Sequence, residues 1–212
     1  MEQFVNAVLL TVGLGAVIGI LCTLLGLIRG KNASENPKTD PAEEAPARTA
    51  VVCCTGIDQV CSRKNDYQGP ASCAAASTLF GGPLTCPNAC LGGGDCRDAC
   101  PQKAIVLRNG LAVVDRSRCT GCGRCTDACP RGLIKLMPQR PCAYVACSIS
   151  TAGNEGSGAC TAGCDGCGLC SVVCPKGAVR TSGRLPSIDP DLCDGCGVCA
   201  RSCPRNLIHI LS

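Results

Sequence analysis

The sequence predicts an α+β protein, built from two tandem copies of one small cysteine-rich unit behind a single apolar helix. Three observations predict this class: one cysteine motif recurs along the chain, the spacing of the cysteines repeats, and a long apolar stretch lies near the N-terminus. The 212 residues include 24 Cys but only two Phe, two Tyr and no Trp. Side-chain packing alone therefore gives a thin core.

The motif C-x2-C-x2-C-x3-C-P occurs three times, beginning at Cys119, Cys164 and Cys193. Three thiolates in such a loop bind one 4Fe-4S cluster, and the cysteine before the proline binds a second cluster. Disulfide frameworks and zinc ribbons have no reason to repeat this spacing. Loops in pairs predict two tandem ferredoxin-like units of the bacterial 2×(4Fe-4S) type, each with pseudo-twofold βαββαβ topology.

The cysteines of the first unit recur in the second at one constant offset, which takes Cys90 to Cys164 and Cys129 to Cys203. We call this relationship the cysteine repeat. It exposes one gap in the first unit: Gly93 aligns with Cys167, so a loop cysteine is missing there. Cys86, which aligns with the surplus Cys160, is the expected replacement.

Cofactors are therefore expected to be at least four 4Fe-4S clusters. Each cluster takes three cysteines from one loop and a fourth from the partner loop of the same unit. The expected ligand sets are Cys86, Cys90, Cys96 and Cys129; Cys100, Cys119, Cys122 and Cys125; Cys164, Cys167, Cys170 and Cys203; and Cys174, Cys193, Cys196 and Cys199.

The N-terminal residues 1–30 predict a transmembrane anchor. Phe4 to Ile28 carries no charge and is long enough to span a bilayer as a helix. Because Arg29 and Lys31 follow it, we expect a single-pass protein of the bacterial inner membrane, with its N-terminus outside and its iron-sulfur domains in the cytoplasm. Residues 31–50 are rich in proline and predict a linker.

Residues 51–85 hold Cys53, Cys54, Cys61 and Cys73 at irregular spacing. Two interpretations stay open for them: a further cluster site, which is favoured because dense thiols in a reducing compartment are usually metal ligands, or free buried thiols. Cys73 aligns with Cys147, whereas Cys142 has no counterpart. The roles of Cys142, Cys147 and Cys160 are left open.

Each predicted unit contains a hairpin. In the first, residues 86–140, the segments 105–108 and 111–115 flank Asn109-Gly110, a pair suited to a type I′ turn. Residues 141–159 form a connector. In the second unit, residues 160–212, the segments 178–181 and 185–188 flank Ser182-Gly183.

The composition and motifs favour electron transfer. The formal charge is +4 with 20 scattered basic residues, which does not indicate nucleic-acid binding. The chain has no phosphate-binding loop, nucleotide fingerprint, catalytic triad or paired carboxylates, and its one histidine, His209, lies on an apolar C-terminal segment. We therefore expect closely spaced clusters that relay electrons, with no catalytic pocket in this chain.

The chain also resembles a known family. Four features carry the resemblance: the loop C-x3-C-x5-C-x3-C-P from Cys86 to Pro101, the run from Cys73 to Gly81-Gly82-Pro83 before it, the segment Cys160-Thr-Ala-Gly-Cys164, and the apolar stretch. Together they resemble the B subunit of the Rnf complex of anaerobic bacteria. The resemblance implies an electron-transfer subunit of an ion-translocating ferredoxin:NAD+ oxidoreductase. Its partners would be soluble ferredoxin and the other membrane and peripheral subunits. Relatives carry an additional cluster domain after the helix, where this chain has its linker.

An acidic ferredoxin would dock on basic residues around the cluster loops. The expected docking residues are Arg124, Arg131, Arg201 and Arg205. Two alternatives remain: a membrane-tethered polyferredoxin of a hydrogenase or another respiratory complex, and a cluster-based redox sensor or zinc scaffold.

Overall fold

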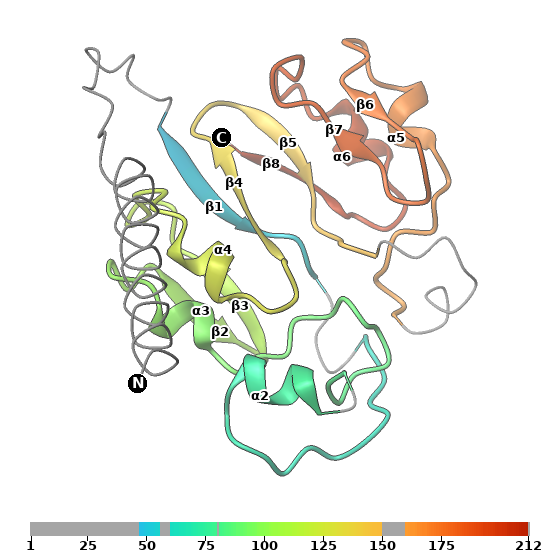
Figure 1. The fold of residues 1–212 in the computed structure, drawn as a ribbon. Helices are drawn as coiled ribbons and strands as arrows, with labels where there is room; N and C mark the ends of the chain where they lie inside the picture. Colours follow the sequence, from blue (N-terminus) through green and yellow to red (C-terminus); the bar gives the residue numbers. More distant parts are fainter. Residues whose placement is uncertain (1–46, 56–59, 80, 150–159, 212) are drawn as a thin grey trace, which may run out of the picture. The chain divides into compact units, whose positions relative to one another are not determined.

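The computed structural model describes residues 47–55, 60–79, 81–149 and 160–211 (Figure 1). The predicted membrane helix and nearly all of the predicted linker lie outside the described residues. Among the residues described, no helix has both the length and the apolar character needed to cross a bilayer. The membrane-anchor prediction therefore stays a prediction.

The first unit follows the predicted βαββαβ order. Strand β1 pairs antiparallel with β4, and β2 pairs antiparallel with β3. An additional short helix, α2 (Cys73–Thr78), lies between β1 and α3. The elements are β1 (Arg48–Val52), α3 (Asp95–Asp98), β2 (Ile105–Arg108), β3 (Leu111–Val114), α4 (Arg124–Ala128) and β4 (Ile134–Pro138).

The second unit repeats this order and these pairings without a counterpart of α2 among the described residues. Strand β5 pairs with β8, and β6 with β7, both antiparallel. The elements are β5 (Cys142–Val145), α5 (Leu169–Val172), β6 (Val179–Arg180), β7 (Ser187–Ile188), α6 (Val198–Ser202) and β8 (Ile208–Leu211).

Both units begin earlier in the chain than the sequence predicts. Strand β1 lies in residues assigned to the linker and the upstream cysteine segment, and β5 lies in residues assigned to the connector. Ala50 pairs with Leu136, and Ala143 pairs with Ile210, so the two strands take equivalent places against β4 and β8. The opening strands do not share the offset of the cysteines, because the first unit has a longer insertion after its opening strand. The cysteine repeat therefore does not reveal them.

The hairpin of the first unit forms as predicted. Arg108 pairs with Leu111, leaving a two-residue turn in which Asn109 has φ 48° and Gly110 has φ 75°. Positive φ at both central positions is the signature of a type I′ turn. In the hairpin of the second unit fewer residues pair: Val179 with Ile188 and Arg180 with Ser187. Residues 181–186 separate its two strands.

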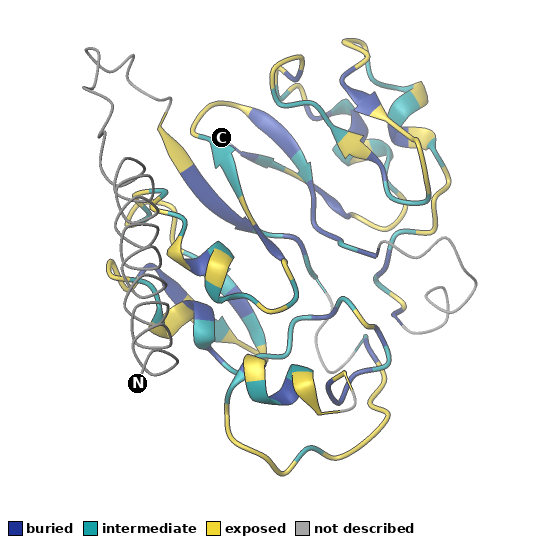
Figure 2. Ribbon diagram, viewed as in Figure 1, coloured by how far each residue is buried: buried dark blue, intermediate teal, exposed yellow. Residues whose placement is uncertain are grey.

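The four helices of the repeated units are short, and each places one buried cysteine. Each follows a glycine with positive φ, which turns the loop into the helix without the strain that a side chain would add. Figure 2 shows buried residues interspersed with more exposed ones along these helices and strands. The buried cysteines are Cys96, Cys125, Cys170 and Cys199.

Candidate metal centres

Two cavities in the described residues are lined by cysteine sets that the sequence predicts. The remaining lining residues are mainly apolar, including Ala104, Ile105 and Leu136 in the first cavity and Leu207 and Ile208 in the second. The first set is Cys100, Cys119, Cys122 and Cys125, and the second is Cys164, Cys167, Cys170 and Cys203.

A third cavity corrects the prediction for the first unit. Its four cysteines are Cys73, Cys90, Cys96 and Cys129. Cys86, the expected replacement for the missing loop cysteine, does not line this cavity. The inserted helix α2 brings Cys73 there instead, because the insertion folds back over the loop that contains Gly93.

Gly93 makes room for this replacement. A Cβ atom at position 93 would lie 2.5 Å from the backbone nitrogen of Cys73, closer than real Cβ contacts allow. Asp95 then fixes the start of α2, since its carboxylate accepts hydrogen bonds from the backbone N–H of Cys73 (2.8 Å) and of Ala74 (2.9 Å). Ser72 donates its hydroxyl to the same carboxylate at 3.1 Å. These contacts hold Cys73 against the loop that it completes.

The pKa of Asp95 reflects these contacts. Partial burial opposes ionisation, but the backbone N–H groups of Ala74 and Cys73 and the Ser72 hydroxyl together hold the pKa of the carboxyl below its usual value. Asp95 is therefore ionised at neutral pH and stabilises the N-terminus of α2 as a charged acceptor.

The fourth predicted set also comes together, since Cys193 and Cys199 lie in one buried core cluster and Cys174 packs against it. Burial, followed by the nearby thiols of Cys193, Cys174 and Cys196, raises the pKa of Cys199. The four residues belong to the two loops that the sequence pairs in the second unit. The structure thus brings together three of the four predicted sets unchanged and the remaining set with Cys73 in place of Cys86.

Backbone N–H groups point at several of these sulfur atoms. Ala50 in β1 donates to Cys119 Sγ at 3.4 Å, and Ala143 in β5 donates to the equivalent Cys193 Sγ at 3.3 Å. Burial alone would raise the pKa of Cys119, but the backbone hydrogen bonds from Ala50 and Gly121 bring it below its usual value. In the first unit the opening strand therefore stabilises the thiolate of Cys119, the form that binds iron.

The cavity around Cys73 disfavours the thiolate form of its cysteines unless a positively charged group is bound there. Burial and the neighbouring thiols of Cys90, Cys73 and Cys129 raise the pKa of Cys96 to about 12. Four thiolates crowded into an apolar cavity repel one another, so a positively charged cluster of iron is the group that would offset their charge.

The donor sets fit 4Fe-4S clusters, in which four irons each take one thiolate. Among the described residues, no three His, Cys, Asp or Glu side chains stand close enough to hold a single metal ion. Each of the three sets lines one cavity.

Exposure distinguishes the four sets. Cys122, Cys167 and Cys196, the middle cysteines of their loops, are exposed. In the set with Cys90, Cys96 and Cys129, Cys73 takes the place of the middle loop cysteine, and it is buried. A cluster in that set would thus be covered, while the other three would approach the surface.

The four upstream cysteines do not form one site. Cys73 lines the cavity described above, and Cys53 is 2% exposed in the core, where its carbonyl accepts a hydrogen bond from Ser148 (3.0 Å). Cys54 is half-buried, and Cys61 packs elsewhere, with Cys86, in a different apolar cluster. The expected cluster on these four residues is therefore replaced by a different grouping. No disulfide joins cysteines within the described residues.

The predicted docking arginines divide into two pairs. Arg124 and Arg201 are exposed beside the cluster loops, and Arg201 also donates to the carbonyl of Cys196 in its own loop at 3.4 Å. Arg131 donates to the backbone carbonyls of Gly81 and Pro87, and Arg205 donates to the carbonyl of Thr161. These last two side chains therefore hold the fold together, which their positions after a Cys-Pro pair did not reveal.

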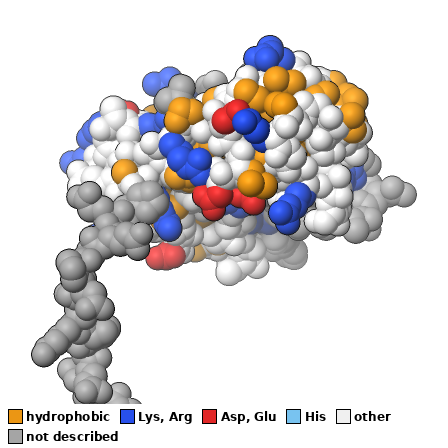
Figure 3. All heavy atoms as spheres, turned by 90° about the horizontal axis from the view of Figure 1, so that it is seen from above, with side chains coloured by type: hydrophobic (Ala, Val, Ile, Leu, Met, Phe, Trp, Pro, Cys, Tyr) orange, Lys and Arg blue, Asp and Glu red, His pale blue; other side chains and the backbone are white. Residues whose placement is uncertain are grey.

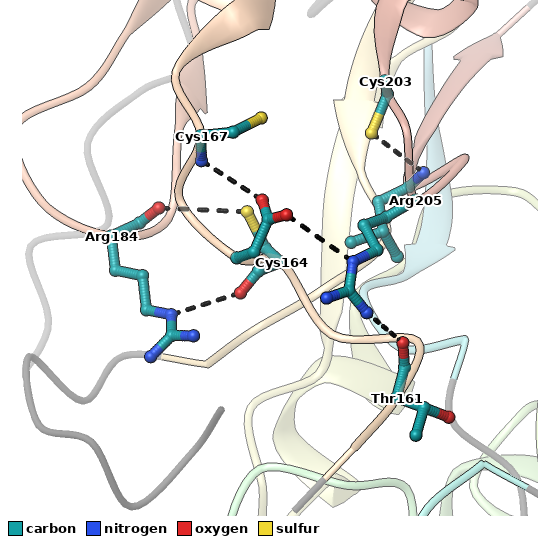
Figure 4. Close-up of polar contacts among 8 residues, drawn as sticks. Thr161, Cys164, Cys167, Arg184, Cys203 and Arg205 are labelled. Atoms are coloured by element: carbon teal, nitrogen blue, oxygen red, sulfur yellow. Dashed lines mark hydrogen bonds and ion pairs between the residues drawn. The ribbon is translucent and has the colours of Figure 1, made fainter. Parts of the chain in front are cut away.

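Figure 4 shows how Arg205 is held. Its Nε lies 3.6 Å from the carboxylate of Asp165, which also accepts a hydrogen bond from the backbone N–H of Cys167 at 3.2 Å. Cys164 belongs to the same loop as Cys167, and its carbonyl accepts a hydrogen bond from Arg184 at 3.2 Å. On the face shown in Figure 3, Lys and Arg side chains are scattered among acidic and apolar ones, as the sequence predicts.

Comparisons with protein families identify iron-sulfur domains along these residues. Residues 83–139 match the LdpA Fe-S cluster-binding domain, and residues 118–178 and 163–207 match two 4Fe-4S dicluster domain families. These matches agree with the cavities, and the chain carries several 4Fe-4S clusters.

Two curated relatives extend this result. The B subunit of the Na(+)-translocating ferredoxin:NAD(+) oxidoreductase complex of Acetobacterium woodii is 34% identical over 121 residues, 57% of this chain and 36% of the relative. The proton-translocating counterpart of Clostridium ljungdahlii is 39% identical over 117 residues, 55% of this chain and 41% of the relative. The chain thus spans less than half the length of either relative. The matched iron-sulfur domains and these two relatives show that the chain is similar to the B subunit of the Rnf ferredoxin:NAD+ oxidoreductase complexes.

Proposed function

We propose that this chain is a membrane-anchored electron-transfer subunit of an ion-translocating ferredoxin:NAD+ oxidoreductase. It accepts electrons from reduced soluble ferredoxin and relays them through its clusters to other subunits of the complex. It acts as part of this translocase, and the reaction with NAD+ takes place elsewhere in the complex. The names of the two relatives support the complex, and the cysteine sets support the relay.

The observation that carries this proposal is the arrangement of four sets of four cysteines in two βαββαβ units. The assigned ligands are the four sets described above, with Cys73 in place of Cys86. Repeated clusters of one type suit transfer of single electrons along a path. A redox sensor needs only one labile cluster, and a zinc scaffold has no need of the repeated C-x2-C-x2-C-x3-C-P spacing.

Electrons enter where a cluster lies near the surface. The exposed thiols of Cys122 and Cys196 mark two such places, and the exposed side chains of Arg124 and Arg201 lie close to them in sequence. A ferredoxin with an acidic surface would be attracted to these cations over a distance of about 10 Å at moderate salt. Arg131, which is half-buried, and Arg205, whose charge is paired with Asp165, are not part of this docking surface.

The location follows from the same proposal. Phe4 to Ile28 would hold the chain in the inner membrane, with the residues after Arg29 in the cytoplasm. Soluble ferredoxin is found in that compartment, and its reducing conditions protect exposed clusters. The apolar segment also gives the neighbouring membrane subunits a surface to bind.

The test is the rate at which reduced ferredoxin bleaches the visible absorbance of the anaerobically purified full-length chain, measured by stopped flow at several salt concentrations. We expect the Arg124→Gln, Arg201→Gln double variant to react about tenfold more slowly at low salt, and the difference to shrink as salt rises. The matched control is Arg108→Gln with Arg180→Gln, which removes two exposed arginines from the hairpin strands. A wild-type chain that dithionite reduces but reduced ferredoxin does not would contradict the proposal.

A further inference from the structure

Six buried cysteines of the described residues belong to none of the four sets, and four of these six lie close together. Cys61, Cys86, Cys147 and Cys160 are 1%, 5%, 7% and 9% exposed, and all four lie in one core cluster. They come from four separate parts of the sequence, so folding brings them together. The other members of the cluster are apolar: Leu84, Ala89, Val145, Ile149 and Leu207.

The backbone around Cys61 explains how three of them meet. Cys61 forms an antiparallel bridge with Cys160, and the N–H of Thr161 donates to the carbonyl of Val60 at 2.9 Å. On its other side, the N–H of Thr85 donates to the carbonyl of Ser62 at 2.9 Å. The segment that contains Cys61 therefore lies between the segments that carry Cys86 and Cys160.

Two equivalent arginines fix the outer segments. Arg131 and Arg205 align in the cysteine repeat, and they donate to the carbonyls of Pro87 and Thr161, which align in the same way. Each carbonyl belongs to the residue directly after a cysteine of the group, Cys86 or Cys160 (Figure 4 shows the contact with Thr161). The two units thus hold equivalent cysteines in place by the same contact.

Cys147 completes the group from the segment just after β5 of the second unit. It follows Ala146, whose N–H donates to the carbonyl of Leu207 at 2.7 Å, so its position is set by the sheet of that unit. Its counterpart in the repeat is Cys73. In the first unit that cysteine replaces the missing loop cysteine, whereas the second unit has Cys167 and leaves Cys147 available for a different role.

We propose that Cys61, Cys86, Cys147 and Cys160 hold a fifth 4Fe-4S cluster. Four thiols at one buried place match the ligand set of the other clusters in the chain. Cysteines used only for packing have no reason to gather from four segments, and burial of four thiolates requires a positive partner.

The electrostatics agree with this grouping. Burial raises the pKa of Cys86, and the nearby thiols of Cys61, Cys160 and Cys147 raise it further. Burial likewise raises the pKa of Cys160, with Cys61 and Cys147 as additional causes. A bound iron cluster would remove this penalty, as it does for any deprotonated thiol ligand.

The fifth cluster would connect the two units. Cys164 and Cys203, from the first-loop set of the second unit, pack against the same core cluster. On the other side, Cys86 is joined through a turn, closed by the Ala89 N–H at 3.2 Å, to Cys90 of the first unit's set. If the chain is a relay, as proposed above, one electron would pass from a reduced cube of one unit to the oxidised fifth cube and then to the other unit. No bond forms or breaks in these steps.

The test is analysis of iron and acid-labile sulfide in the anaerobically reconstituted full-length chain. We expect about 20 iron per wild-type chain and about 16 in the Cys61→Ala, Cys160→Ala double variant. The matched control is Cys53→Ala with Cys142→Ala, which removes two buried thiols outside all five sets and should keep about 20 iron. About 16 iron in the wild type, or an unchanged value in the first variant, would overturn the fifth site.

A second variant covers the case in which the double variant loses all of its iron. Cys147→Ser changes the shape of the side chain little, and we expect it to lose or alter one cluster signal in the electron paramagnetic resonance of the reduced protein. An unchanged spectrum with about 20 iron would exclude Cys147 as a ligand and overturn the proposal. A chain with about 20 iron that ferredoxin does not reduce would contradict the proposed function but keep the fifth site.

Discussion

Gly93 and Cys73 are in direct contact, so that a Cβ atom at position 93 would stand 2.5 Å from the backbone nitrogen of Cys73. In the second unit the residue equivalent to Gly93 is Cys167, which lines the cavity itself. The first unit thus lacks a loop cysteine and has the space that lets a distant cysteine take its place.

The separate roles of Cys73 and Cys86 can be tested by combining substitutions. We expect Cys73→Ala and Cys86→Ala each to lose about four iron per chain, and the double variant to lose about eight, because each residue serves a different cube. Iron analysis of the three purified variants gives the answer. A double variant that loses only about four would place both residues on one cluster.

Gly93→Ala should weaken the first unit. The added methyl group forces the start of α2 away from the loop, at an overpacking cost of about 1–3 kcal/mol in the free energy of unfolding. Guanidinium unfolding of the anaerobic holoprotein, followed by loss of visible absorbance, measures this change. Gly183→Ala is the control, since a Cβ there would meet nothing within 4 Å. Equal stability of the two variants would refute the close contact.

Asp95→Asn should release Cys73 from its position. The charged cap contributes about 1–2 kcal/mol, and asparagine replaces one of the accepting oxygens with a donor. Because the folded state lowers the pKa of Asp95, its contribution is complete above the ordinary aspartate pKa and is lost as pH falls through the lowered value. The difference in stability between wild type and variant should therefore be constant near neutral pH and shrink below about pH 4. A difference that instead grows on acidification would contradict this role.

Arg131 and Arg124 should behave in opposite ways. Arg131→Gln loses hydrogen bonds to two carbonyls and should cost about 1–3 kcal/mol of stability, with little change in the rate of reduction by ferredoxin. Arg124→Gln should slow that reduction at low salt and leave stability nearly unchanged. Unfolding and stopped-flow measurements on both variants separate the two effects. A large loss of docking rate in Arg131→Gln alone would return Arg131 to the docking surface.

Much of the fold could be predicted because the cluster loops impose it. The spacing of the cysteines fixes which residues of a loop face one cube, and Asn109-Gly110 fixes the turn of the first hairpin. Three of the four ligand sets come together as their spacing indicates. The opening strands escaped prediction because an insertion changes their distance from the loops, so β1 and β5 do not follow the cysteine repeat.

The cysteine repeat alone could not predict that Cys73 takes the place expected for Cys86. Cys86 has an equivalent in Cys160, but equivalence shows a shared position in the repeat and not which cavity a side chain lines. One signal was available: Asp95 aligns with Leu169, so the first unit alone has a carboxylate able to cap a helix beside its incomplete loop. The gathering of Cys61, Cys86, Cys147 and Cys160 depends on contacts between distant segments, which spacing does not encode.

The most direct test of this account is a map of the iron positions, from anomalous scattering at the iron edge in crystals of the anaerobic holoprotein. The account predicts five clusters, one beside Cys73, Cys90, Cys96 and Cys129 and one among Cys61, Cys86, Cys147 and Cys160. Four clusters, with Cys86 bound to the same cube as Cys90, would contradict it.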